Sequence, residues 1–170
     1  MGVEDVLGTA GRVAGHGRYG GGGGVDGKGL VVLGTVTLPG VGRSVGCARA
    51  FVRGLLADLP GRDDVVMAAS ETVANAVTHT ASGLEGGLVT VTVAAAPGAV
   101  LLEVTDDGAA GTRPYVKDDP GAETGRGMRI VQGLAARWGY RADGTRTVVW
   151  AEFPAPDAWV RGRGAVSGPG

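Results

Sequence analysis

The stretch from Val65 to Thr80, VVMAASETVANAVTHT, constrains the fold of this chain more than any other. Its apolar residues recur at helical spacing, which predicts an amphipathic helix with one face in a core. The opposite side carries Glu71 and Asn75, followed by Thr78 or His79. Asn is unfavourable inside a helix, because its amide competes for backbone hydrogen bonds. This polar side is either a solvated face, which is the commoner case, or a set of oxygen ligands.

The composition fits one folded domain with extra residues at both ends. The 170 residues are 44% hydrophobic, which is enough for one sizeable core. The 16 basic and 17 acidic residues leave a formal net charge of -1, so direct nucleic-acid binding is not expected. Cys47 is the single cysteine, which fits a reducing compartment. No apolar run has the length of a signal peptide or membrane span, so we expect a cytoplasmic protein without membrane association.

Both ends of the chain are rich in glycine. Residues 1–29 end in RYGGGGGVDGKG and lack apolar periodicity, which predicts a disordered tail. Residues 154–170 are rich in Pro and Gly and predict a second disordered tail. The first tail is neither a dinucleotide motif nor a P-loop, because no strand precedes its glycines and no Ser or Thr follows its Lys-Gly pair. We therefore expect the folded domain to span residues 30–153.

The expected domain alternates between strand and helix patterns. The segments, in chain order, are a strand at 30–38, helices at 41–59 and 65–80, strands at 88–95 and 100–105, a helix at 128–136, and strands at 138–142 and 145–153. Asp63 or Asp64 is expected to cap the second helix, and Asp143-Gly144 to close the final hairpin. Helices on one face of a mixed, mostly antiparallel sheet make an α+β fold, a two-layer sandwich.

A second candidate site follows the strand LLEVTDDG. Asp106 ends this strand, and Gly108 stands where the backbone turns with positive φ or approaches another group. A plain hairpin turn is the alternative, since Asp-Gly is the commonest hairpin dipeptide. The next roughly 17 residues contain no strand pattern, and a long loop of this kind favours a lid over a hairpin.

A third candidate site precedes the helix MRIVQGLAA. Gly125 and Gly127 flank Arg126 immediately before Met128. Glycines at a helix N-terminus leave backbone N–H groups free, and these groups suit anionic phosphates. Taken alone, the same glycines are equally compatible with a simple linker.

The three sites occur in an order that resembles the GHKL ATPase superfamily. Within it the chain resembles the bacterial anti-sigma factor serine kinases, which have a histidine kinase-like ATPase domain and regulate sporulation and general stress. The resemblance covers residues 38–153 and implies a Bergerat ATP-binding fold. The segments that carry it are CARAFVRGLL, SETVANAVTHT, EVTDDG, GRGMRIVQGLAARWG and GTRTVVWAEF.

The resemblance implies how adenine is recognised. Asp106 would accept a hydrogen bond from the adenine amino group. Gly108 would let the ring approach, and Thr147 would support it through water.

The resemblance also implies roles in phosphate transfer. Asn75 would bind Mg²⁺, and Glu71 would be the catalytic base. The residues expected to contact the phosphates of ATP belong to one segment: Gly125, Arg126, Gly127 and Met128.

Two functions follow from this reading. The first is a serine protein kinase that transfers the γ-phosphate of ATP to a small antagonist protein and so regulates transcription by partner switching. The second is a nucleotide-gated module that binds a sigma factor or another regulator with little or no turnover. Glu71 favours the kinase, because a pure switch needs no base. A single copy and a homodimer are both compatible with the sequence.

Overall fold

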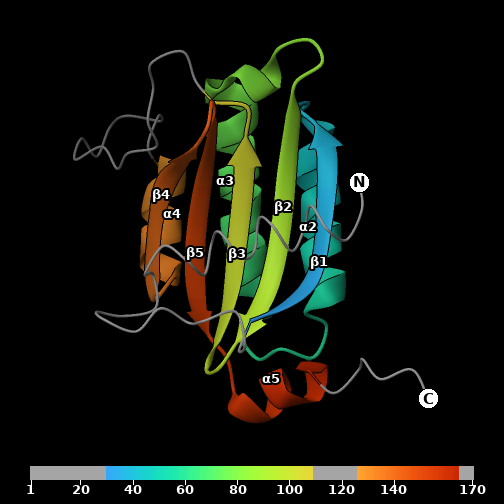
Figure 1. Ribbon diagram of the computed structural model, residues 1–170, viewed down its shortest axis with the longest axis vertical. Helices are drawn as coiled ribbons and strands as arrows, with labels where there is room; N and C mark the ends of the chain where they lie inside the picture. The colour runs from blue at the N-terminus through green and yellow to red at the C-terminus, as the bar shows by residue number, and fades with distance from the viewer. Residues whose placement is uncertain (1–29, 109–125, 165–170) are drawn as a thin grey trace.

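The computed structural model describes residues 30–108 and 126–164 (Figure 1). The described elements are β1 (Val31–Pro39), α2 (Arg43–Leu55), α3 (Arg62–His79), the short 3₁₀ helix η1 (Ala81–Gly83), β2 (Leu88–Ala96), β3 (Ala99–Asp106), α4 (Arg126–Leu134), β4 (Arg137–Asp143), β5 (Arg146–Pro154) and α5 (Asp157–Gly164). The five expected strands and the three expected helices, here α2, α3 and α4, are all present, with ends shifted by a few residues.

The strands form one sheet in the order β1-β2-β3-β5-β4. Helices α2, α3 and α4 lie side by side behind this sheet, and α5 lies below it (Figure 1). The predicted α+β two-layer sandwich is therefore confirmed. Every pairing in the described part of the sheet is antiparallel, so the sheet is not mixed there. No helix in the described ranges combines the length and apolar character needed to cross a membrane.

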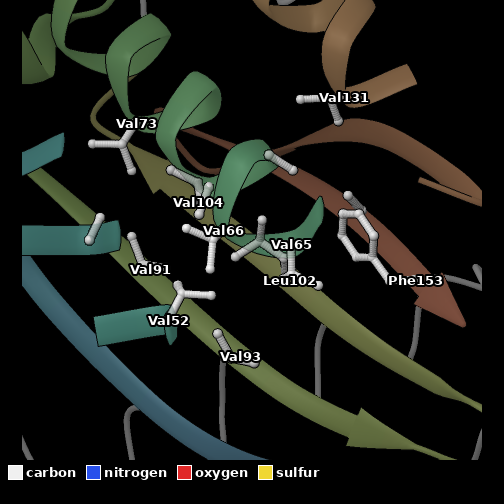
Figure 2. Packing of buried hydrophobic residues seen from close by; sticks show 14 of the residues in the cluster. Val52, Val65, Val66, Val73, Val91, Val93, Leu102, Val104, Val131 and Phe153 are labelled. Atoms are coloured by element: carbon white, nitrogen blue, oxygen red, sulfur yellow. The ribbon is translucent and has the colours of Figure 1, made fainter. Parts of the chain in front are cut away.

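The main core lies between the sheet and the helices. Alternate residues of each strand point to the same face, so every second side chain of β2, β3 and β5 enters this core. Figure 2 shows α3 seated over these strands, with α2 and α4 contributing from either side. The labelled core residues are Val52, Val65, Val66, Val73, Val91, Val93, Leu102, Val104, Val131 and Phe153.

Charged residues on the opposite face of the sheet are paired. Arg141 contacts Glu103 at 2.7 Å, and Glu103 is only 1% exposed. Arg137 donates two hydrogen bonds to Glu152, at 2.9 and 3.0 Å. A buried carboxylate is tolerated when a cation with good hydrogen-bond geometry neutralises it. These pairs account for the buried acids on the face away from α2, α3 and α4.

The start of α3 differs from the sequence-based expectation. Gly61 precedes the helix with φ 79°, and no side chain caps the helix there. Asp63 and Asp64 instead lie within its first turn. A left-handed residue is favourable only for glycine, which explains why Gly61 occupies the boundary. The two acids still stabilise the helix, because negative charge is favourable near a helix N-terminus.

The expectation of an unstructured C-terminal tail is wrong for Asp157–Gly164, because these residues form α5. Trp159 and Val160 on this helix pack against the main core. The guanidinium of Arg163 lies 4.9 Å from the centre of the Trp159 ring and 3.4 Å from Asp58. Trp159 and Val160 are the only large apolar residues of this helix, which is too few to show a helical period in the sequence.

Removal of the Trp159 side chain should therefore destabilise the domain. We expect Trp159→Ala to lower the free energy of unfolding by about 2 to 4 kcal/mol, somewhat less than for a fully buried tryptophan. Leu84→Ala is the control, because Leu84 is 70% exposed. Chemical denaturation measures both. A chain ending at residue 153 should likewise melt below one ending at residue 164, and equal stability of these two chains would contradict the packing of α5.

Candidate functional site

Glu71 and Asn75 lie one turn apart on α3, and the first turn of α4 packs directly against them. A Cβ atom on Gly127 would lie 2.8 Å from Glu71 Oε2 and 3.3 Å from Asn75 Nδ2. The first of these distances is closer than side-chain contacts allow, so a larger residue would displace the glutamate. Glycine at position 127 thus leaves room for the ends of both side chains beside the first turn of α4. The structure brings together three residues that the sequence predicted for the site.

The N-terminus of α4 presents backbone donors beside this pair. The first N–H groups of a helix have no partner within the helix and carry partial positive charge. Arg126, the first residue of α4, is exposed, whereas Gly127 and Met128 are buried. Met128 belongs to the main core and so anchors this turn. Gly125 lies outside the described residues.

Asp106 ends β3 on the side of the sheet that faces the helices. It alternates with Leu102 and Val104, both in the main core, and is 3% exposed. Its cross-strand partner on β5 is Thr147, which is partly buried. Asp106 Oδ1 accepts a hydrogen bond from the Gly108 amide at 2.7 Å. A carboxylate at this position is therefore held in one orientation by the backbone of the following turn.

Burial raises the pKa of Asp106 from 3.8 to about 6. Loss of hydration is the largest cause, and the negative charge of Asp107 adds to it. Hydrogen bonds from the backbone of Gly108 and Thr147 lower the pKa but do not cancel the effect of burial. A buried acid with a raised pKa costs stability, and such groups are common at functional sites.

Gly108 has φ 83°, as the sequence predicted for this position. A Cβ atom there would collide with the carbonyl oxygen of Thr145. The turn does not lead into a hairpin, because β3 already has β2 on one edge and β5 on the other. The plain hairpin alternative is thereby excluded.

The segment after α3 contributes residues that the sequence analysis did not single out. Ser82 Oγ accepts a hydrogen bond from the Asp107 amide at 2.9 Å. Asp107 Oδ2 accepts one from the Leu88 amide at 2.7 Å. The only signal for this packing was the density of glycine around Ser82, where Gly83 and Gly87 each approach backbone closely.

The group formed by Glu71, Asn75 and Gly127 and the group around Asp106 lie at one end of the sandwich. The ends of β3 and α3 are both at the top of Figure 1, with η1 beside them. In the described ranges, no three His, Cys, Asp or Glu side chains gather as a metal cluster. Cations such as Mg²⁺ prefer hard oxygen ligands and keep several of their waters. Hard oxygen atoms for this purpose are available on Glu71 and Asn75.

Comparison with known proteins agrees with this arrangement. Residues 41–153 match the family described as "Histidine kinase-like ATPase domain", and the chain belongs to this family. The GHKL resemblance is confirmed at that level. No curated protein sequence matches the chain.

One of the solved structures that the chain resembles is the crystal structure of the RsbU and RsbW domains of Rv1364c from Mycobacterium tuberculosis. The TM-score is 0.51 at 22% sequence identity, over 71% of this chain. The matched part is 31% of that chain, so this protein corresponds to about a third of its length. At this identity the likeness establishes a shared fold.

The raised pKa of Asp106 predicts how stability depends on pH. The folded state holds this proton up to about pH 6, whereas the unfolded chain releases it near 3.8. Stability is thus lost as pH rises through that window, by about 1.4 kcal/mol for each pKa unit. Asp106→Asn removes the titration and retains an acceptor for Gly108. The ligand-free variant should melt several degrees above wild type at neutral pH.

Thermal unfolding across the acid range checks this expectation. The advantage of Asp106→Asn should shrink as pH falls toward the ordinary pKa of aspartate. Glu85→Gln, which makes the same change of charge at an exposed position, is the control. A variant less stable than wild type at neutral pH would contradict the proposed cost of burying Asp106.

Proposed function

We propose that this protein is an ATP-binding serine protein kinase of the anti-sigma factor type. In this function it transfers the γ-phosphate of ATP to a small antagonist protein and regulates transcription by partner switching in the cytoplasm. The observation that carries the proposal is the contact of Gly127 with Glu71 and Asn75. This contact places a carboxylate, an amide oxygen and a helix N-terminus together, in a chain of the histidine kinase-like ATPase family.

Asp106 would recognise adenine. Its carboxylate has acceptor capacity beyond the hydrogen bonds from Gly108 and Thr147, and the adenine amino group is a donor. Guanine has a carbonyl oxygen at the corresponding position, which would leave two acceptors facing each other in a buried site. Gly108 would let the ring approach, and Thr147 would support the ring through water. The site should therefore prefer ATP to GTP.

Asn75 would hold Mg²⁺ through its amide oxygen, together with phosphate oxygens and water. This donor set fits the ion, because Mg²⁺ prefers hard oxygen ligands and keeps several of its waters. The bound ion would neutralise charge on the phosphates. Gly125, Arg126 and Gly127 would hold the β and γ phosphates at the start of α4, where free N–H groups favour anions.

Glu71 would act as the base for the incoming serine hydroxyl. Phosphoryl transfer requires the protein to position the groups, to stabilise charge and to receive the proton of the nucleophile. Glu71 lies one helical turn from Asn75 and touches the first turn of α4. It is therefore beside the proposed phosphate position, where a base is useful. A module that only changes shape on binding nucleotide needs no carboxylate there.

Mg-ATP should stabilise the folded protein. At a concentration about 100 times Kd the gain is about 2.7 kcal/mol, which raises the melting temperature by roughly 5 to 10 °C for a domain of this size. Mg-GTP should give a smaller shift. Asp106→Asn should lose the shift while remaining folded without ligand, and Glu85→Gln should retain it. An unchanged wild-type melting curve in millimolar Mg-ATP would reject nucleotide binding.

Glu71→Gln should separate binding from catalysis, because it keeps the size of the side chain and removes the proton acceptor. We expect Mg-ATP affinity to stay unchanged and phosphate transfer to fall by about 10² to 10⁴. The acceptor is the partner captured from native cytosol in the presence of ATP or ADP, and radiolabelled ATP measures transfer. Asn75→Ala should weaken Mg-dependent binding as well as transfer.

Two outcomes would change the proposal. Equal transfer by wild type and Glu71→Gln would show that this carboxylate is not the base. Tight ATP binding by wild type without transfer to any captured partner would favour the nucleotide-gated binding module instead.

A further inference from the structure

A short segment, residues 80–88, follows α3 in the chain and makes hydrogen bonds to the turn that carries Asp106. We propose that Ser82 in this segment is a positioning residue for adenine recognition. The inference rests on the proposed nucleotide site. In it, Ser82 acts through the Asp106–Gly108 turn and does not touch the nucleotide itself.

The hydroxyl of Ser82 is fully buried and makes hydrogen bonds in both directions. Ser82 is 0% exposed. Its Oγ donates to the carbonyl oxygen of Leu88 at 2.6 Å and accepts from the amide of Asp107 at 2.9 Å. One small side chain thus joins the start of β2 to the residue after β3. Loss of this hydroxyl would take a partner from the partly buried Asp107 N–H donor and from the partly buried Leu88 carbonyl acceptor, which costs more than one ordinary hydrogen bond.

The backbone around Ser82 is closely packed. Its carbonyl oxygen lies where a Cβ atom on Gly40 or on Gly87 would collide with it. The amide of Gly40 also donates to the carbonyl oxygen of Gly87 at 2.9 Å. The position of Ser82 is therefore set from two sides, and its side chain has little freedom to adopt another geometry.

The same segment holds the turn that orients Asp106. The amide of Ala81 donates to the carbonyl oxygen of Gly108 at 2.7 Å. The amide of Gly108 in turn donates to Asp106 Oδ1 at 2.7 Å. Ser82 fixes Asp107, and its neighbour Ala81 fixes Gly108. The turn behind the adenine-binding carboxylate is thus anchored at two successive residues.

The segment is also attached to α3, which carries Asn75. Thr80 Oγ1 donates to the carbonyl oxygen of Ala76 at 2.6 Å and accepts from the amide of Ser82 at 3.1 Å. Asn75 immediately precedes Ala76. A path of hydrogen bonds and short stretches of backbone therefore runs from the proposed metal ligand to the proposed adenine acceptor. Ser82 lies within this path and helps to set the separation of the two contacts.

Ser82→Ala should weaken recognition of adenine selectively. We expect its affinity for Mg-ATP to fall about tenfold, as for the loss of a buried hydrogen bond near a binding site. Its affinity for Mg-tripolyphosphate, which lacks adenine, should stay unchanged. Isothermal titration at a temperature well below the melting point of the variant measures both ligands.

Ser70→Ala is the matched control. Ser70 is also buried, donates to the carbonyl oxygen of Val66 at 2.9 Å and accepts from Arg49 at 3.3 Å. It loses the same kind of hydroxyl at the interface with α2. We expect a comparable drop in melting temperature with no change in the ratio of the two affinities. An equal loss of ATP affinity in both serine variants, or an equal loss for both ligands in Ser82→Ala, would overturn the proposal.

Amide hydrogen exchange of Gly108 tests the positioning role without nucleotide. Exchange should be faster in Ser82→Ala than in Ser70→Ala, because only the first variant loosens the turn. Equal exchange rates would overturn the proposal. If the wild type bound no ATP, the proposed function would fail, while the exchange rates would still decide whether Ser82 holds the turn.

Discussion

The packing of α3 across the middle of the sheet is the contact on which the rest of the structure depends. Val66, Ala69, Val73 and Ala76 on this helix are at most 3% exposed. Burial of these residues removes apolar surface from water, and the small alanines let the helix approach the strands closely. A helix buried along one side cannot rotate, so the direction of its polar side is determined as well. The packing of the core thereby orients Glu71 and Asn75 toward α4.

Two buried acids of β3 illustrate different ways of placing charge in a folded domain. Glu103, on the opposite face of the sheet, is buried but neutralised by Arg141. Asp106 is buried with no such cation beside it among the described residues, and its pKa rises to about 6. Within the part of the chain that the structure describes, the backbone of Gly108 and Thr147 donates hydrogen bonds to its carboxylate. The energetic cost of burying Asp106 is consistent with a role in ligand recognition, because a paired acid could not serve a ligand donor equally well.

Much of the site could be predicted from its glycines, because a glycine at such a position usually reflects a positive φ or a close approach of another group. Gly108 has the positive φ expected after a strand that ends in Asp, and Gly127 lies at the helix N-terminus that the sequence predicted, beside Glu71 and Asn75. The role of Ser82 could not be predicted, because its partners Leu88 and Asp107 meet it only after β2 and β3 have paired. The same limit applies to α5, because its few apolar residues have a surface to pack against only after the core has assembled.

The order of the elements along the chain and the buried face of α3 can be read from the linear sequence, because periodicity is local. The family was indicated by the resemblance of several short motifs, which also survive in a linear chain. Only the tertiary structure decided that Gly127 touches Glu71 and Asn75, and that Asp106 holds its proton up to about pH 6. Contact between distant segments and removal of water from a carboxylate both require the whole core to be assembled, because each depends on atoms contributed by several elements at once.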